Sequence, residues 1–442
     1  MSPAPHPKKT AKPDARALAL DLIAAVLHKD QMLDAALSAA EREKGGTFNA
    51  LEPRDRAFAR LITATVLRRL GQIDATLADY LKRPLGEKGA RVHDILRLSI
   101  AQLIFLDTPP HAAVDAAVNL TRAEGYDPLA GLVNGVLRKL VRDGKAGIEK
   151  QDAPRLNTPY WLWKSWISAY GEETTRAIAR VHLADPPLDF TIRDNPALWA
   201  EKLGGVVLPT GSVRVSGGGQ VREMAGYDEG TWWVQDAASA LPVRLLGNVQ
   251  GKRVADLCAA PGGKTAQLAA GGAQITAIER SKKRLVRMEE NLSRLGFEVE
   301  TICTDAATWQ PKTPFDAILL DAPCTATGSL RRHPDVARLK SDEDVTRLAA
   351  DQDRLIANAA QMLAPGGTLV YCTCSLQKEE GEDRIADALK TISSLKRSPI
   401  TADEIGGLTQ AITKNGEMRT LPCHLTELGG LDGFFAARLI KN

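Results

Sequence analysis

The chain has 442 residues, which is too long for one ordinary domain and predicts two or three. Hydrophobic residues make up 44% and charged residues 25%, as in soluble globular proteins, and 57 basic against 54 acidic residues leave the charge nearly balanced. A nucleic-acid partner is neither required nor excluded by this balance, since binding depends on local patches. No run reaches the roughly 18 apolar residues that suggest a membrane span.

Cysteine usage and the start of the chain indicate the compartment. The six cysteines all lie at or after Cys258, which is a poor layout for a disulfide scaffold, and no second pair with histidines completes a zinc pattern. The proline- and lysine-rich start lacks the apolar core of a signal peptide. We therefore expect a cytoplasmic protein with reduced thiols, no metal and no membrane segment.

In chain order, residues 1–14 are predicted to be a flexible arm, with a solvated tail of no role as the alternative. Residues 15–143 place apolar residues three and four apart in segments such as ARALALDLIAAVL and ARVHDILRLSIAQLIFL, which predicts an all-helical domain. Residues 144–230 are mixed: NTPYWLWKSWISAYG favours an aromatic-rich helix, and LDFTIRDN and the valines from Val206 to Val215 favour short strands. This predicts a small α+β subdomain.

Residues 231–442 alternate short β-type runs with helical stretches. The runs are RVADLC, AQITAIE, EVETIC, FDAILLDA and GTLVYCTC, and the helical stretches between them include SKKRLVRMEENLSRL. Such alternation predicts a parallel sheet with helices on both faces. Two final β-type runs, GEMRTLPC and DGFFAARLI, predict a hairpin added to that sheet.

A glycine-rich turn follows the first of these strands, in CAAPGGK. The phosphate-loop pattern fails because its first glycine would fall at Cys258, and the dinucleotide pattern also fails. The turn suits the amino-acid end of a ligand. The second strand ends at Glu279, which could bind ribose hydroxyls, and the third ends at Asp305, placed for an adenine amine. Taken singly, either carboxylate could instead be a helix cap or a solvated residue.

The fourth and fifth strands deliver DAPCTATGSLRRHPDV and CTCS. In a doubly wound sheet the fourth strand lies between the first and the fifth, so Asp321, Cys324 and Cys374 should converge beside the cofactor. A thiolate that adds to carbon 6 of cytosine makes carbon 5 nucleophilic enough to take a methyl group, and Asp321 could hydrogen-bond or protonate nitrogen 3. We expect Cys374 to be the nucleophile and Cys324 to help release the product, although DNA-type cytosine methylases use a proline–cysteine pair like that of Cys324.

Basic residues accompany these motifs. Lys264 could contact the cofactor carboxylate or the substrate, or could be a surface lysine at a helix start. Arg331, Arg332 and His333 follow the Cys324 loop and could form a basic lip for RNA phosphates, with a solvated loop as the alternative.

The motifs CAAPGGK, DAPCTATGSLRRHPD and YCTCSLQKEE resemble the RNA 5-methylcytosine methyltransferases of the Nol1/Nop2/Sun group, and VQDAASA matches their pattern. The helical segments, with GLVNGVLRKL, resemble the antitermination factor NusB. The resemblance implies an α/β class I methyltransferase domain with a seven-stranded, mostly parallel sheet, a NusB-like domain and an RRM-like subdomain. It implies S-adenosylmethionine held by these residues: Cys258, Ala259, Ala260, Pro261, Gly262, Gly263, Lys264, Glu279, Asp305 and Asp321.

The expected activity is methyl transfer from S-adenosylmethionine to carbon 5 of a cytosine in RNA by a monomeric enzyme, with 16S ribosomal RNA as the expected substrate. Two alternatives stay open. One is methylation of transfer RNA, which shares all the chemistry. The other is a non-catalytic RNA-binding or assembly factor that uses the NusB-like domain, although the intact Cys324, Cys374 and Asp321 argue against it.

Overall fold

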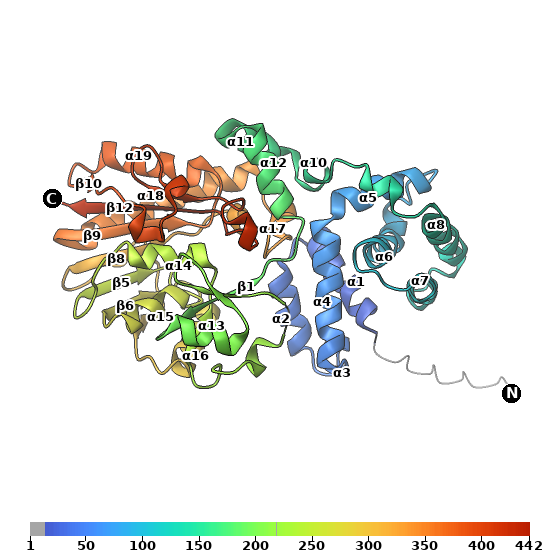
Figure 1. Ribbon diagram of the computed structural model, residues 1–442, viewed down its shortest axis with the longest axis horizontal. Helices are drawn as coiled ribbons and strands as arrows, with labels where there is room; N and C mark the ends of the chain where they lie inside the picture. The colour runs from blue at the N-terminus through green and yellow to red at the C-terminus, as the bar shows by residue number, and fades with distance from the viewer. Residues whose placement is uncertain (1–13, 218) are drawn as a thin grey trace. The chain divides into compact units, whose positions relative to one another are not determined.

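A computed structural model describes residues 14–217 and 219–442 (Figure 1). They form two compact units, one of residues up to Pro159 together with His333–Leu339, and one of Tyr160–Arg332 together with Lys340–Asn442. Apart from Asp14, the predicted arm over residues 1–14 lies outside the described residues. The division of the chain into an arm and three domains stays a prediction. Among the described residues, no helix combines the length and apolar character needed to cross a membrane.

The first unit is all-helical. Its core consists of apolar side chains that recur at helical spacing, among them Ile23, Ile62 and Ile95, each fully buried. Asp14 caps the first helix by accepting a hydrogen bond from the backbone N–H of Arg16 at 2.9 Å. The longer helices are α1 (Ala15–Lys29), α2 (Leu33–Arg42), α4 (Pro53–Arg68), α5 (Leu70–Tyr80), α6 (Ala90–Ile100), α7 (Pro110–Ala123) and α8 (Ala130–Asp143). The predicted helical region is confirmed.

A short segment from the second half of the chain also belongs to this unit. It contains α17 (Val336–Leu339), and Leu339 packs against the helical core. Asp335 Oδ2 accepts a hydrogen bond from the backbone N–H of Leu33 at 2.9 Å, and Arg338 donates to the carbonyl of Asn157. The chain that follows the Cys324 loop is therefore fixed by contacts within the helical unit.

The second unit begins with α11 (Tyr160–Tyr170) and α12 (Glu172–Val181), followed by a small antiparallel sheet. Phe190 and Trp232 are fully buried there and meet edge to face, with ring centroids 4.7 Å apart. The strands are β1 (Leu188–Ile192), β2 (Val206–Val207), β3 (Val213–Val215) and β4 (Trp232–Val234), in the order β2-β3-β1-β4, with α13 (Pro196–Leu203) between β1 and β2. The aromatic-rich helix and the short strands agree with the sequence pattern; β4 was not predicted.

The main sheet of this unit has the order β7-β6-β5-β8-β9-β12-β10, with β11 paired to β12. All pairs from β7 to β9 are parallel, whereas β10, β11 and β9 pair with β12 antiparallel. The strands are β5 (Arg253–Leu257), β6 (Gln274–Ile278), β7 (Glu300–Ile302), β8 (Phe315–Asp321), β9 (Leu363–Thr373), β10 (Leu395–Arg397), β11 (Met418–Thr420) and β12 (Phe434–Lys441). The predicted seven-stranded, mostly parallel sheet is confirmed, and β11 adds a short eighth strand.

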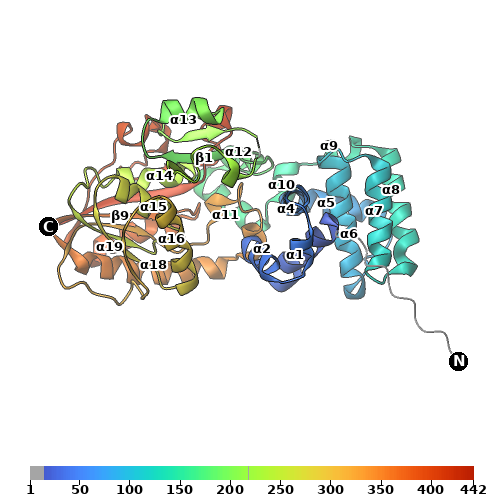
Figure 2. The same cartoon turned by 90° about the horizontal axis from the view of Figure 1, so that it is seen from below.

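Helices cover both faces of this sheet, as the alternation predicted (Figure 2). Val254 and Leu319 point into a core shared with α14, α15 and α16, while Ala255 and Leu320 point into a core shared with α18 and α19. Successive strand residues face opposite sides, so both faces of each central strand are buried. The helices are α14 (Ala237–Arg244), α15 (Gly263–Ala270), α16 (Lys282–Arg294), α18 (Asp342–Met362) and α19 (Glu382–Thr391).

Candidate active site

The strand register brings the predicted site residues to one edge of the main sheet. Leu257 pairs with Ile278 on one side and with Leu320 on the other, so the residues that follow β5, β6 and β8 begin at the same level. Asp321 in turn pairs with Cys372, two residues before Cys374. In an open parallel sheet, the crevice at the carboxyl ends of the strands is where ligands bind.

The glycine turn has a backbone that requires its small residues. Cys258 has a φ of 63° and Gly262 a φ of 98°, and α15 starts at Gly263. A Cβ on Gly262 would lie 2.6 Å from Cγ of Met288, a contact that real Cβ atoms do not make. Of the other residues in the turn, Ala259 and Ala260 are buried and Pro261 is exposed. Gly262 therefore lets the turn pack against Met288 of α16, which a larger residue would prevent.

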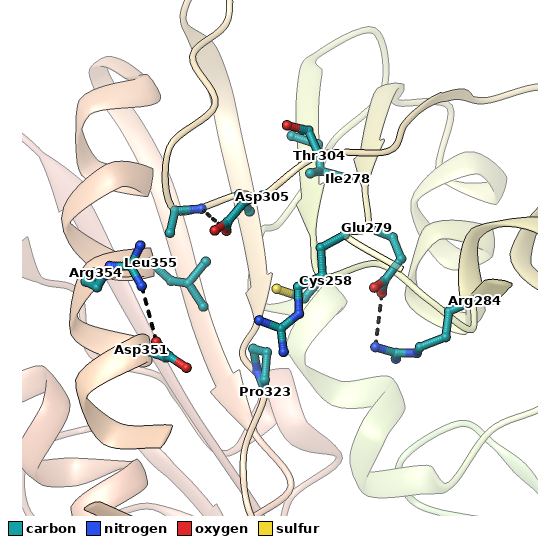
Figure 3. A pocket seen from close by; sticks show the side chains of 13 residues that line it. Cys258, Ile278, Glu279, Arg284, Thr304, Asp305, Pro323, Asp351, Arg354 and Leu355 are labelled. Carbon is teal, nitrogen blue, oxygen red and sulfur yellow. Dashed lines mark hydrogen bonds and ion pairs between the residues drawn. The ribbon is translucent and has the colours of Figure 1, made fainter. Parts of the chain in front are cut away.

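A pocket opens beside this turn, lined by Cys258, Glu279, Asp305 and Pro323 together with neighbouring residues (Figure 3). Glu279 is only 2% exposed, and its Oε1 accepts a hydrogen bond from the backbone N–H of Ser281 at 2.9 Å. Its Oε2 is buried and accepts no hydrogen bond from the described residues, although Nη1 of Arg284 lies 3.1 Å away. A buried carboxylate oxygen without a hydrogen-bond donor calls for one from a ligand.

The far wall of the pocket is formed by Asp305 and α18. Asp305 is exposed, and its Oδ1 accepts a hydrogen bond from the backbone N–H of Ala307 at 2.9 Å. Ile278 and Leu355 contribute apolar surface to the same pocket (Figure 3). The pocket thus combines carboxylates and other polar groups with apolar side chains, which suits a nucleoside. Over the described residues, no group of three histidines, cysteines or carboxylates could hold a metal ion.

Lys264 is buried and forms an ion pair inside the site. Its Nζ lies 2.8 Å from Oδ2 of Asp321 and 2.9 Å from Oγ of Ser239. Burial alone would lower the pKa of Lys264, but the charge and hydrogen bond of Asp321 together with the nearby Cys372 and Cys374 outweigh burial, and the pKa is raised. The surface-lysine alternative is therefore wrong. Ser239 was not identified as a site residue, although it lies in the VQDAASA motif.

The two predicted catalytic cysteines are in contact. Sγ of Cys324 lies 3.5 Å from Sγ of Cys374, and both residues are half-buried. The hydrogen bond with Cys374, and then burial, raise the pKa of Cys324, so this residue is held as a thiol. The charges of Lys264 and Arg332 both interact with the Cys374 sulfur. Reactive cysteines lie in electropositive surroundings of this kind.

Two other cysteines lie in or directly after strands of the main sheet. Cys372 is fully buried, as expected for a strand interior, and its Sγ lies 3.6 Å from Oδ1 of Asp321. Cys303 is exposed, because β7 ends at Ile302 and Cys303 already belongs to the following loop.

The predicted basic lip is not a single surface. Arg331 is fully buried: it donates to Oδ1 of Asp432 at 2.8 Å, to the carbonyl of Gly429 and to Asp236. Arg332 is 34% exposed and pairs with Oδ2 of Asp432. The assignment of Arg331 to RNA phosphates is corrected, because a buried guanidinium that neutralises two buried carboxylates cannot reach a phosphate.

His333 belongs to the helical unit, where its Nδ1 lies 3.8 Å from Oδ2 of Asp34. Its ring is 34% exposed. The contact between His333 and RNA stays a prediction.

Comparison with known proteins agrees with this geometry. A family model described as 16S rRNA methyltransferase RsmB/F matches residues 243–440, and the NusB family model matches residues 13–142. Ribosomal RNA small subunit methyltransferase B of Cronobacter sakazakii is 34% identical over 96% of this chain and 98% of its own length. The enzyme of the same name from Pseudomonas putida is 34% identical over the same shares.

Solved structures are similar as well. The structure of PH0851 covers 97% of this chain and 99% of its own with a TM-score of 0.76 and 24% identity, which shows a shared fold. A methyltransferase homologue from Pyrococcus horikoshii is 26% identical with a TM-score of 0.53, over 63% of this chain and 94% of its own. The resemblance to the Nol1/Nop2/Sun group and to NusB, and within that group to bacterial RsmB (Sun/Fmu), is confirmed. The chain therefore belongs to the ribosomal RNA small subunit methyltransferase B family.

Proposed function

We propose that this protein transfers a methyl group from S-adenosylmethionine to carbon 5 of a cytosine in 16S ribosomal RNA, through a covalent bond between Cys374 and carbon 6 of the base. The observation that carries the proposal is the 3.5 Å contact between the sulfurs of Cys324 and Cys374, on strand ends that also hold the Lys264–Asp321 pair. Family membership supports the RNA substrate.

The pocket fits S-adenosylmethionine. The backbone of Cys258–Lys264 would hold its amino-acid end, because this turn follows the carboxyl end of β5 and leads into the N-terminus of α15. Oε2 of Glu279, buried without a hydrogen-bond donor among the described residues, would accept from a ribose hydroxyl, and Asp305 would bind the adenine amine. When bound, S-adenosylmethionine supplies an electrophilic methyl group.

Different residues of the chain act at different atoms of the base. The Cys374 thiolate adds to carbon 6, and the electrons of the ring double bond make carbon 5 the nucleophile. Nitrogen 3 becomes more basic as this happens. Asp321 would hold nitrogen 3 by a hydrogen bond, as the donor when its carboxyl group is protonated or as the acceptor once nitrogen 3 carries the proton.

Release of the product reverses the addition. A base removes the proton from carbon 5, the ring double bond forms again, and the bond from sulfur to carbon 6 breaks. Cys324, whose sulfur is in contact with Cys374, would donate a hydrogen bond to the departing thiolate. Without this donor, the adduct should persist.

The RNA must present the cytosine unpaired, or the base must be flipped out, because both ring faces are approached. Of the predicted basic residues, Lys264, Arg332 and His333 remain proposed RNA contacts. Lys264 would act at the base itself, since its ammonium lies inside the site. Arg332 is the residue that could bridge the site and a phosphate, since part of its side chain is exposed.

The test uses 16S ribosomal RNA carrying tritium on carbon 5 of its cytosines and unlabelled S-adenosylmethionine. We expect one tritium released for each methyl group transferred, at a single position that bisulfite sequencing then maps. Transfer RNA with the same label is the comparison. Methyl transfer without tritium release would exclude carbon 5, release only from transfer RNA would change the substrate, and failure on every RNA would indicate a non-catalytic factor.

A further inference from the structure

Behind the two cysteines lies a buried carboxylate that the proposed mechanism does not use. Glu380 is fully buried in the 3-10 turn Lys378–Glu380, beyond the end of β9. Its Oε1 accepts a hydrogen bond from the backbone N–H of Thr325 at 2.9 Å, and its Oε2 accepts from the hydroxyls of Thr325 and Ser375, each at 2.5 Å. Thr325 directly follows Cys324 in the sequence, and Ser375 directly follows Cys374. One carboxylate thus joins the residues next to both sulfurs.

The carboxylate is itself fixed from two directions. Nε2 of Gln352 donates to Oε1 of Glu380 at 3.3 Å and to the carbonyl of Pro323 at 2.9 Å. The hydroxyls of Tyr371 and Thr373 donate to the backbone carbonyl of Glu380, at 2.8 and 3.1 Å. All of these groups are buried or come from the central strands, so Glu380 is a fixed point against which the loops are held.

Other bonds also connect the two cysteine loops. The backbone N–H of Gly328 donates to the carbonyl of Cys374 at 2.9 Å, and the backbone N–H of Leu376 donates to Oγ1 of Thr327 at 3.0 Å. Oγ of Ser375 lies 3.3 Å from Oγ1 of Thr325 and 3.2 Å from Oγ1 of Thr327. Glu380 accepts from both hydroxyls of the Thr325–Ser375 pair, so its carboxylate fixes the hydroxyls nearest to the two sulfurs. Burial raises the pKa of Glu380, and the hydrogen bonds from Ser375 and Thr325 oppose that shift. Burying a carboxylate costs free energy unless its oxygens accept hydrogen bonds, so the position of Glu380 depends on this set of donors.

We propose that Glu380 is a positioning residue that holds the sulfurs of Cys324 and Cys374 in contact. The proposal rests on the proposed function, in which the contact between the two sulfurs lets Cys324 assist the departure of Cys374. Loss of the carboxylate leaves Thr325 and Ser375 without their common acceptor, so the connection between the loops loosens next to the two sulfurs. Misplacement of reacting groups by about 1 Å can cost on the order of 100-fold in rate.

The direct test measures sulfur proximity without any methyl transfer. Purified protein is equilibrated with glutathione redox buffers: two thiols and one oxidised glutathione give the Cys324–Cys374 disulfide and two reduced glutathiones. The exposed Cys303 is replaced by serine to avoid mixed disulfides. Mass spectrometry quantifies the cross-linked peptide pair. We expect Glu380→Ala to lower the equilibrium constant at least tenfold, because the sulfurs are no longer held together.

Two variants serve as matched comparisons. Glu379→Ala removes the same side chain from the neighbouring, exposed position and should leave the equilibrium unchanged. Glu380→Gln should restore most of it, because the amide oxygen can accept from Thr325 N–H while its NH₂ group donates to the two hydroxyls, which can rotate to accept. If Glu380→Ala does not fold, Thr325→Val and Ser375→Ala each remove one hydroxyl donor, and the double variant should reproduce the loss.

Kinetics separate a positioning role from a general loss of structure. With the wild type active, Glu380→Ala should lower kcat by about 10- to 100-fold while KM for S-adenosylmethionine stays within twofold, because none of the hydrogen-bond partners of Glu380 named above lines the pocket. An unchanged disulfide equilibrium in folded Glu380→Ala would overturn the positioning role, whatever the activity. If Glu380→Ala lowers the disulfide equilibrium constant tenfold but the wild type methylates no RNA, the positioning role stands and the proposed function is overturned.

Discussion

Replacing Arg331 by methionine distinguishes a buried structural charge from an RNA contact. The guanidinium is fully buried between Asp236 and Asp432, and methionine replaces the aliphatic part of the side chain without the charge. Breaking a buried ion pair by removing one partner costs about 3–5 kcal/mol. A protein unit of this size loses about 2–4 °C of melting temperature per kcal/mol, so we expect a drop of about 6–20 °C.

Tryptophan fluorescence measures this unit selectively, since all seven tryptophans lie between Trp161 and Trp309. Arg332→Met is the matched control. The Arg332 side chain is 34% exposed, and Asp432 remains paired with Arg331 in this variant. Its loss should be smaller, and it should reduce the salt dependence of RNA binding by about one phosphate contact. An Arg331→Met variant with unchanged melting but weaker RNA binding would refute the reasoning.

Three further predictions follow from the site. Glu279→Gln should weaken binding of S-adenosylhomocysteine by about 10- to 100-fold in calorimetry, because a charged hydrogen bond is lost; equal affinity would remove Glu279 from the pocket's function. Lys264→Met and Asp321→Asn should each lower kcat, and the double variant should lose little more than the worse single one, because the two groups act as a pair; additive losses in single-turnover rates would contradict this. Burial raises the pKa of Asp256 to about 7 in the folded state, so the folded state binds more protons than the unfolded state and the unfolding free energy falls as pH rises from about 4 to 7. Asp256→Asn should therefore be more stable than wild type at pH 8 in urea unfolding, with a smaller difference at pH 4; a difference independent of pH would exclude this group.

The order of strands and the convergence of the cysteines could be predicted because they depend on local patterns. Apolar alternation marks the strands, and the carboxyl ends of neighbouring parallel strands meet at one edge, so Asp321, Cys324 and Cys374 had to approach each other. The short strand β10 carries too few residues to show any alternation, which is why it was missed.

Partners that are distant in the chain could not be predicted from local pattern. The basic run at Arg331 has the composition of an RNA-binding lip, but Asp236 and Asp432 lie about a hundred residues away on either side and enclose it. Glu380 stood within a recognised motif, yet its hydrogen bonds to Thr325 cross between two loops. Burial of a charge depends on such three-dimensional compensation, which a sequence pattern does not display.

The most direct measurement of the central claim is the covalent bond itself. Wild type, Cys324→Ala and Cys374→Ala are incubated with 16S ribosomal RNA and S-adenosylmethionine, and protein–RNA adducts are isolated under denaturing conditions and mapped by mass spectrometry. We predict an adduct that accumulates in Cys324→Ala, with the nucleotide on the sulfur of Cys374, and none in Cys374→Ala. Accumulation in Cys374→Ala with the nucleotide on Cys324 would contradict the assignment of the two sulfurs.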